Sequence, residues 1–365
     1  LEDILERSKK IEGPVLIHVV TKKGKGYALA EKNPDKFHGI SAYNKETGET
    51  KKKKDYSKVF GDKLIELAKK DPKIVAVTAA MRDGTGLKEF STEFPDRFFD
   101  VGIAEQHALG LIAGMAKAGL KPVLPIYSSF LQRGYDQIVH DIALSNLPVT
   151  VCIDRAGIVG NDGETHQGIF DLSFLSSIPN IVIMAPKNFE ELEKMLEFGI
   201  NLNKPVFIRY PRGGETLKFP KTEDISLGKA EIIQNGNDLS IIAIGKMVEK
   251  AKKIADLMPA KKVEIINARF LKPLDEETIL KSIQKTKKVA TIEDNLQKGG
   301  LGSAVVELIN QKTTENIKTQ IFGYDDIFVE HGSVEEIEEK YYMNSQKIAE
   351  KLIRFLEEKE WNKRW

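Results

Sequence analysis

Short apolar runs alternate with amphipathic segments along most of this 365-residue chain, and this alternation constrains the fold more than any other feature. Short apolar runs are expected to be buried strands, and segments with one apolar face are expected to be helices. In a first series, the expected strands are residues 74–78, 122–127, 148–154, 181–184 and 205–210, and the expected helices are 59–70, 129–145 and 189–202. Strands that alternate with helices form parallel sheets covered on both faces.

The same alternation begins again near residue 225. Its expected strands are residues 239–244, 263–267, 288–293 and 317–322, and its expected helices are 247–257, 276–284, 303–310 and 345–358. A chain of this length can form two domains with separate cores. We therefore predict two consecutive three-layer α/β/α domains, at residues 55–220 and 221–365.

Residues 1–54 do not fit either domain. The apolar run at residues 13–20 predicts a buried strand, but one strand cannot form a sheet. We therefore expect this segment to be the tail of a domain that lies mostly outside the chain, which starts with leucine rather than methionine. Lysines at residues 51–54 predict a solvated linker that ends near residue 55.

Composition excludes several classes of protein. The formal net charge of +1 lacks the basic excess of a nucleic-acid-binding protein. No apolar run reaches the roughly 18 residues that a membrane span needs, and no signal peptide is visible. The single cysteine, Cys152, lies in an expected strand and is interpreted as a core residue. We expect a cytoplasmic protein that binds neither nucleic acid nor membrane.

Residues 100–108 (DVGIAEQHA) join an apolar run to a helical segment rich in small residues. Gly102 is the expected hinge, so Glu105 falls in the first turn of a helix, at the carboxyl edge of a parallel sheet. Ligands bind at that edge in α/β proteins, and the helix dipole stabilises a carboxylate there. The alternative is an ordinary first-turn acid, since such positions favour glutamate.

Two further stretches accompany this one: residues 127–133 (YSSFLQR) and residues 154–168 (DRAGIVGNDGETHQG). Together the three resemble the pyrimidine-binding domain of transketolase-like thiamine diphosphate enzymes, and most closely the family of 1-deoxy-D-xylulose-5-phosphate synthases. The resemblance runs from about residue 11 to the C-terminus. It implies a transferase that condenses pyruvate, with loss of CO₂, with glyceraldehyde 3-phosphate, for isoprenoid, thiamine and pyridoxal biosynthesis. A homodimer is also implied.

The resemblance assigns roles to individual residues. It places Glu105 against a ring nitrogen of the cofactor's pyrimidine, Phe130 against the ring face, and Arg155 and Arg212 on the phosphate of the aldehyde. The implied catalytic residues are Glu105, His38, His166 and Asp162, the implied cofactor-binding residues are Glu105, Phe130, Ile103 and Lys23, and the implied substrate-binding residues are Tyr127, Arg133, Arg155 and Arg212.

Structural alternatives remain open for several of these side chains. Phe130 can be a core phenylalanine, and His166 can be a capping or core histidine. Arg133 can form an ion pair with Asp136 or another nearby acid, and Arg209, close to Arg212, can pair inside the protein. The segment Gly299–Gly302 looks like a phosphate loop, but a structural turn before a helix is the favoured interpretation.

The metal motif of the family is missing. Its members hold Mg²⁺ and the cofactor's diphosphate through a Gly-Asp-Gly sequence and a later asparagine, and this chain contains no Gly-Asp-Gly. We therefore expect the Mg²⁺ site in the missing first domain, and expect this chain alone to bind thiamine diphosphate weakly and to be inactive. Alternative functions are a transketolase, the β subunit of a 2-oxo acid dehydrogenase, and a non-catalytic assembly fragment.

Overall fold

The computed structural model describes residues 1–34, 36–37, 42–49 and 54–357. Residues Leu1–Lys53 form one compact unit and Lys54–Trp365 form another. None of the helices in the described ranges combines the length and the apolar character that a membrane span requires.

The unit Leu1–Lys53 contains two short helices, α1 (Glu2–Ser8) and α2 (Ala28–Lys32). The buried strand predicted at residues 13–20 is wrong: these residues form no strand, and Leu16 and Val20 are 94% and 83% exposed. A strand needs a neighbour to satisfy its backbone hydrogen bonds. The described part of this unit contains no second strand.

A seven-stranded sheet forms the first domain of the larger unit, in the order β10-β5-β6-β4-β3-β1-β2. Its strands are β1 (Ile74–Thr78), β2 (Phe98–Asp100), β3 (Lys121–Tyr127), β4 (Thr150–Asp154), β5 (Val182–Met184), β6 (Val206–Arg209) and β10 (Phe270–Lys272). All neighbours pair in parallel except β10, which is antiparallel to β5. This confirms the predicted parallel α/β architecture.

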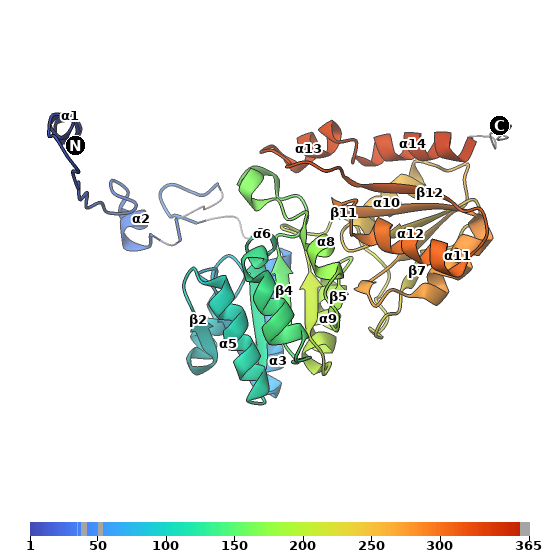
Figure 1. Cartoon of the computed structure of the whole chain (residues 1–365), viewed down its shortest axis with the longest axis horizontal. Helices are drawn as coiled ribbons and strands as arrows, with labels where there is room; N and C mark the ends of the chain where they lie inside the picture. Colours follow the sequence, from blue (N-terminus) through green and yellow to red (C-terminus); the bar gives the residue numbers. More distant parts are fainter. Residues whose placement is uncertain (35, 38–41, 50–53, 358–365) are drawn as a thin grey trace. The chain divides into compact units, whose positions relative to one another are not determined.

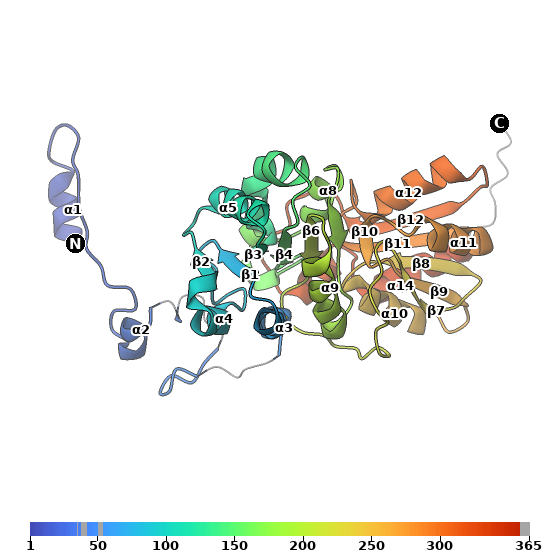
Figure 2. The ribbon, with the colours of Figure 1, turned by 90° about the horizontal axis from the view of Figure 1, so that it is seen from below.

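Helices cover both faces of this sheet (Figure 2). On one face, α3 (Tyr56–Lys70), α4 (Lys88–Glu93) and α9 (Phe189–Asn201) enclose an apolar core that includes Cys152. On the other face, α5 (Glu105–Lys117) and α8 (Asp171–Ser176) enclose a second core. The predicted core position of Cys152 is confirmed, and burial raises the pKa of its thiol well above the usual value.

The single helix predicted at residues 129–145 is wrong. The chain forms α6 (Ser128–Leu131), the 3₁₀ turn η2 (Gln132–Gly134), α7 (Tyr135–Gln137) and the π-helical segment η3 (Ile138–Ala143). The break accompanies a close approach to α5, where a Cβ atom on Gly134 would lie 2.0 Å from Leu109 Cδ1. The other predicted strands and helices of this unit agree with the structure to within three residues at each end.

The second domain has a five-stranded sheet in the order β12-β11-β8-β9-β7. Its strands are β7 (Glu231–Gln234), β8 (Leu239–Ala243), β9 (Val263–Asn267), β11 (Lys288–Leu296) and β12 (Lys318–Tyr324), of which β7 is antiparallel. Figure 2 shows α11 (Glu276–Thr286) and α12 (Leu301–Lys312) on one face and α10 (Met247–Asp256) and α14 (Ser345–Glu357) on the other. The helix α13 (Val334–Lys340) precedes α14 (Figure 1).

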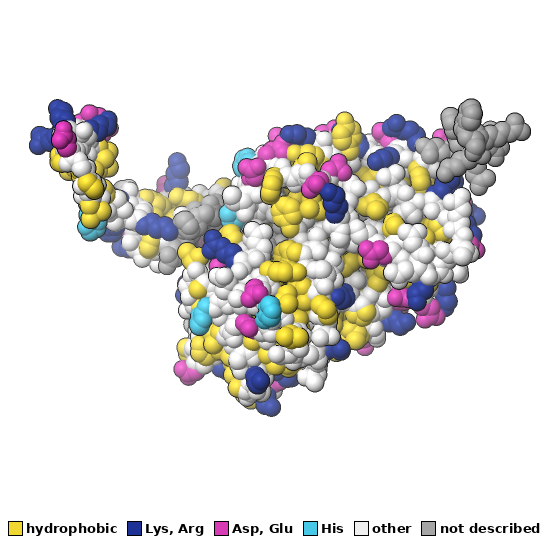
Figure 3. Space-filling model, viewed as in Figure 1, with side chains coloured by type: hydrophobic (Ala, Val, Ile, Leu, Met, Phe, Trp, Pro, Cys, Tyr) yellow, Lys and Arg dark blue, Asp and Glu magenta, His cyan; other side chains and the backbone are white. Residues whose placement is uncertain are grey.

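The two domains are joined by buried charges as well as by β10. Lys187 Nζ, fully buried, lies 3.1 Å from a carboxylate oxygen of Glu191 in the first domain and 2.7 Å from Glu231 in the second. Arg269 Nε of the second domain lies 2.8 Å from Glu191. Separating the domains here would leave uncompensated buried charges, which is costly. On the face drawn in Figure 3, exposed charges of both signs are interspersed.

Candidate functional site

The strand order of the first sheet reverses between β1 and β3, so the carboxyl ends of these two strands mark a switch point. The chain places β2 on one side of β1 and β3 on the other. In open α/β sheets, ligands bind outside the strand ends at such a switch point. The candidate residues follow these ends: Glu105 comes after β2, Tyr127 ends β3, and Arg155 comes after β4.

The segment before α5 is shaped by Asp100 and Gly102. Gly102 has a φ of +72°, which confirms it as the hinge. Asp100 Oδ1 accepts hydrogen bonds from the backbone N–H groups of Gly102, at 3.0 Å, and of Ala80, at 2.9 Å. The loop that follows β1 and the loop that follows β2 are thereby tied together, and Glu105 becomes the first residue of α5.

Glu105 is a buried carboxylate with little local pairing. Its side chain is 4% exposed, and in the described part of the chain its one polar contact is with Arg133 Nη1 at 3.4 Å. A carboxylate can accept about four hydrogen bonds, so acceptor capacity remains. Arg133 therefore contacts Glu105, while Asp136 lies 2.9 Å from His140 Nδ1.

Three rings lie together beside this carboxylate's helix. The ring of Phe130 stacks on Tyr127 with 5.6 Å between centroids and meets the ring of His166 edge-on at 5.3 Å. All three side chains are half-buried, so Phe130 is not enclosed in the core. His166 ends the short turn η5 (Glu164–His166), and Thr165 Oγ1 lies 2.9 Å from its Nδ1.

Gly84 is a site residue that the sequence reasoning missed. A Cβ atom at this position would lie 2.0 Å from the hydroxyl oxygen of Tyr127, so only glycine allows Tyr127 to sit as it does. The glycine follows β1 and Tyr127 ends β3, which places their contact at the switch point. The segment Asp83–Gly86 contains two glycines in the loop that follows β1, which was the available signal.

Charged side chains converge around Tyr127. The guanidinium carbon of Arg155 lies 4.3 Å from the centre of its ring. Burial raises the pKa of the Tyr127 hydroxyl; Asp154 and Asp162 also raise it, and Arg155 and Arg212 oppose the rise. These four residues come from the ends of β4 and β6 and from the loop after β4, so the fold brings together the predicted phosphate ligands Arg155 and Arg212.

Arg155 forms an ion pair with a buried carboxylate. Its Nη1 lies 2.9 Å from Asp154 Oδ2 and 3.0 Å from Ser57 Oγ, and that hydroxyl donates to the same carboxylate at 2.7 Å. Burial raises the pKa of Asp154, although Arg155 and Ser57 oppose the rise. Arg155 Nε has no hydrogen-bond partner among the described residues. Ser57 was not identified from the sequence.

Arg212 and Asp162 form an ion pair with each other. Their side chains are 39% and 30% exposed, so both are accessible from solvent. Asp162 belongs to the turn η4 (Gly160–Asp162), on the same loop as His166. Two residues predicted to contact the substrate therefore contact each other in this structure.

Three further residues were predicted to belong to the site. Ile103 is 78% exposed. Lys23 is exposed in the unit Leu1–Lys53, and His38 lies outside the described residues. Within the described ranges, no group of three His, Cys, Asp or Glu side chains is arranged to hold a metal ion.

The glycine segment before α12 is filled by the protein's own carboxylate. Glu293 accepts hydrogen bonds from the backbone N–H groups of Leu301 and Gly302, each at 2.8 Å. Burial raises the pKa of Glu293 to about 8, while the two N–H donors oppose the rise. The structure therefore favours a structural turn over a phosphate loop at Gly299–Gly302.

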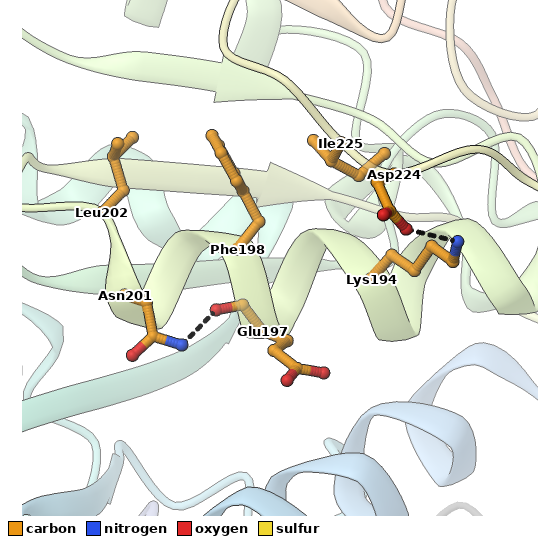
Figure 4. A pocket seen from close by; sticks show the side chains of 7 residues that line it. All are labelled: Lys194, Glu197, Phe198, Asn201, Leu202, Asp224 and Ile225. Carbon is orange, nitrogen blue, oxygen red and sulfur yellow. Dashed lines mark hydrogen bonds and ion pairs between the residues drawn. The ribbon is translucent and has the colours of Figure 1, made fainter.

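An open pocket of about 440 Å³ lies along α9, away from these residues (Figure 4). It is lined by Lys194, Glu197, Phe198, Asn201, Leu202, Asp224 and Ile225. Its polar groups are paired locally: Lys194 Nζ lies 3.0 Å from Asp224, and the Asn201 amide donates to the Glu197 carbonyl. None of the predicted site residues lines it.

Comparisons with known proteins identify both domains. Residues 52–214 match the family model described as the transketolase pyrimidine binding domain, and residues 228–348 match the model of the transketolase C-terminal domain. The chain belongs to the transketolase-like family. Its first domain is therefore the pyrimidine-binding domain of this family, and its second domain is the C-terminal domain.

Curated relatives of this transketolase-like chain carry the name 1-deoxy-D-xylulose-5-phosphate synthase. This chain is 51% identical to the protein of Halothermothrix orenii over 361 residues, which is 97% of this chain and 57% of the relative. It is 48% identical to the protein of Clostridium tetani over 98% of this chain and 58% of the relative. The chain thus spans somewhat more than half the length of these relatives, and the predicted resemblance is confirmed.

Solved structures show the same fold. A structure titled split gene transketolase, inactive beta4 tetramer, matches with a TM-score of 0.75 and 29% identity. The match covers 83% of this chain and 98% of the chain in that structure. A transketolase of Pichia stipitis in complex with sedoheptulose 7-phosphate has a TM-score of 0.69, 20% identity, and coverage of 84% of this chain and 46% of its own. The second likeness shows the fold alone.

Proposed function

We propose that this chain carries the pyrimidine-binding half of the active site of a 1-deoxy-D-xylulose-5-phosphate synthase. This enzyme condenses pyruvate, with loss of CO₂, with glyceraldehyde 3-phosphate, in isoprenoid and thiamine biosynthesis. The observation that carries the proposal is Glu105, a buried carboxylate at the switch point whose one described polar contact is a 3.4 Å ion pair. Relatives about 50% identical over nearly the whole chain support it.

The described residues fit one part of thiamine diphosphate. When bound, this cofactor supplies the carbon nucleophile for bond cleavage and formation next to a carbonyl group. Glu105 has free acceptor capacity for a hydrogen bond from a ring nitrogen, and half-buried Phe130 offers a ring for stacking. A buried carboxylate that holds a proton in this way contributes about 10²- to 10⁴-fold to catalysis.

The diphosphate and Mg²⁺ require further groups. Mg²⁺ takes oxygen ligands, usually carboxylates together with phosphates, and no such metal-binding group is present among the described residues. We propose that a diphosphate-binding domain, in the same longer polypeptide or in a second chain, supplies them. Lys23 and His38 are proposed to act with that domain rather than with the described part of the site.

The aldehyde's phosphate is proposed to bind Arg155 and Arg212. Arg155 keeps an unpaired Nε, whereas Arg212 is already paired with Asp162. We propose that a phosphate that binds Arg212 replaces Asp162 as its partner. The released carboxylate of Asp162 is then available to the hydroxyl groups of the substrate, beside His166, while Tyr127 and Arg133 line the pocket.

A homodimer is proposed through the surface around α5. Ile103 and Leu144 are 78% and 74% exposed, although both are large and apolar. They lie directly before α5 and directly after η3, which packs on α5. Gly114 of α5 has open space where a Cβ atom would be, so a second helix can approach closely there. We propose that a second copy of the chain covers these exposed apolar side chains, since protein interfaces bury such surface.

A second candidate, transketolase, is favoured by one observation. The split gene transketolase chain is matched over 98% of its length and is 29% identical. The two reactions differ in the donor, which is pyruvate for the synthase and a ketose phosphate for transketolase. Turnover of this chain, completed by a diphosphate-binding domain, with each donor in turn decides between them.

The experiment that tests the proposal replaces Glu105. In the completed enzyme, Glu105→Gln should lower kcat by about 10²-fold or more with the fold retained, because the amide cannot hold the proton. Glu89→Gln, an exposed first-turn acid of α4, is the matched control and should not change kcat. Near-normal turnover in a folded Glu105→Gln variant would make Glu105 an ordinary first-turn acid.

Calorimetric titration of this chain alone with thiamine diphosphate provides a second readout. Stacking and one carboxylate contact supply only a few kcal/mol, which the entropy of association largely offsets, so we expect weak binding. Micromolar binding that depends on Mg²⁺ would contradict the proposal that the metal site lies elsewhere.

A further inference from the structure

The second sheet has a switch point of its own. The chain places β9 on one side of β8 and β11 on the other, so the crevice outside the carboxyl ends of β8 and β11 is where a ligand is expected. In this structure that crevice holds part of the first domain. The cavity that remains there measures about 10 Å³, enough for about one water molecule.

The segment inserted into the crevice is the loop after β4. Ile169, at the end of this loop, is fully buried in the apolar core of the second domain, and its carbonyl accepts a hydrogen bond from Leu296 N at 2.9 Å. Ile158, near its start, lines the remaining cavity with Lys250 and Tyr324 of the second domain. The loop that carries Asp162 and His166 therefore has both ends anchored in the second domain.

The two ends of the loop, Gly157 and Gly168, meet at a neck that is held by backbone hydrogen bonds and by the buried charge of Arg209. Gly157 and Gly168 exchange two backbone hydrogen bonds of 2.7 and 2.8 Å. Arg209 Nη2 donates to the Gly168 carbonyl at 3.3 Å, and the same guanidinium forms an ion pair with Asp294 of β11. A Cβ atom on Gly157 would lie 2.0 Å from Asp294 Oδ2, so the neck touches the second domain directly.

Arg209 also lies 2.9 Å from Asp171 of α8. The internal pairing that the sequence left open for Arg209 is thus observed, and its second pair, with Asp294, joins the two domains.

Gln167 fastens the body of the loop. Its side chain is buried; Oε1 accepts a hydrogen bond from Val159 N at 2.9 Å, and Nε2 donates to the Glu330 carbonyl at 3.1 Å. The segment that follows Glu330 lies against the loop, where a Cβ atom on Gly160 would be 3.0 Å from the Gly332 carbonyl oxygen. This segment leads into α13, which Figure 1 shows next to the loop.

We propose that the C-terminal domain serves to set the conformation of residues 157–168, and that Gln167 is the positioning residue that couples this loop to it. In other open sheets this crevice binds a ligand. Here it holds the loop, through contacts of Gly157, Gln167 and Ile169 with the second domain, and we call this set of contacts the grip. Asp162 and His166 lie between the anchored ends, so their positions relative to Arg212 and Phe130 depend on this grip. The catalytic consequence, though not the grip itself, rests on the proposed function.

Hydrogen–deuterium exchange of the purified chain tests the grip without any activity. Gln167→Met keeps the length of the side chain and removes both hydrogen bonds. We expect amides of residues 157–168 to exchange about 10-fold faster or more, with β4 and α9 unchanged. Gln297→Met is the matched control, because Gln297 Nε2 also donates to a backbone carbonyl at 3.1 Å, that of Gly323, within the second domain. It should leave the loop unchanged.

A second variant separates the two bonds of Gln167. Gln167→Glu keeps an acceptor for Val159 N and loses the donor to the Glu330 carbonyl, so it should also loosen the loop. Loop exchange like that of the unchanged protein would refute the coupling between the domains. In the completed enzyme, Gln167→Met should raise KM for glyceraldehyde 3-phosphate several-fold and leave KM for pyruvate unchanged. A loosened loop with unchanged kinetics would refute the positioning role.

An enzyme that lacks synthase activity altogether would refute the proposed function, while the exchange experiment would still decide on the grip.

Discussion

The buried carboxylate of Glu293 predicts an unusual dependence of stability on pH. It lies at the start of α12, where it accepts two N–H donors and fills the segment that resembles a phosphate loop. Burial raises its pKa from the usual 4.5 to about 8 in the folded protein. Because the pKa is higher in the folded protein than in the unfolded chain, Glu293 adds to the free energy of unfolding. This contribution is fully present below pH 4.5 and is lost as the pH rises through 8.

The size of the effect follows from the two pKa values. They differ by about 3.5, and at about 1.4 kcal/mol per pH unit this corresponds to roughly 5 kcal/mol at high pH. Roughly 3–4 kcal/mol of it should be lost between pH 5 and pH 8. Glu293→Gln removes the titration and should be about 1–3 kcal/mol less stable than the protein with Glu293 protonated, since one N–H loses its acceptor. The variant should therefore be less stable at pH 5 and at least as stable at pH 8.

Urea unfolding followed by circular dichroism at pH 5, 6.5 and 8 gives the required free energies. The difference between the variant and the unchanged protein cancels the other titrating groups. Glu336→Gln is the matched control, because Glu336 accepts from Ser333 N at the start of α13 but is exposed and has a lowered pKa. The stability that Glu336 contributes is fully present above its usual pKa. The difference in unfolding free energy between Glu336→Gln and the unchanged protein should therefore stay constant over this range. A constant difference for Glu293→Gln as well would show that Glu293 is ionised throughout and would refute the reasoning.

Two further predictions concern the substrate and the assembly. Arg155→Ala and Arg212→Ala should each weaken binding of glyceraldehyde 3-phosphate by about 1.5–3 kcal/mol, through loss of a charge-assisted hydrogen bond, with KM for pyruvate unchanged; a rise in KM for pyruvate alone contradicts the phosphate role. Ile103→Asp should convert a dimer into a monomer in light scattering after size-exclusion chromatography, because it places a charge on an apolar interface; a dimer that persists excludes this surface.

Local patterns determined much of this protein from the sequence alone. The alternation of apolar runs and helical segments predicted two parallel α/β domains, because strand and helix periodicities depend on neighbours within a few residues. The same local logic placed Gly102 at a hinge and Glu105 in the first turn of α5, where both are found. The motifs also carried the family resemblance, because they are long and contiguous.

Contacts between distant segments were decided only by the tertiary structure. The apolar run at residues 13–20 has the pattern of a buried strand, but pairing needs a neighbour that local pattern cannot supply. The partner of Arg133, the pairing of Arg212 with Asp162, and the need for glycine at residue 84 each depend on which strand ends become adjacent. The grip of the second domain on residues 157–168 joins residues more than 100 positions apart, because packing, not sequence proximity, brings β11 to the loop after β4.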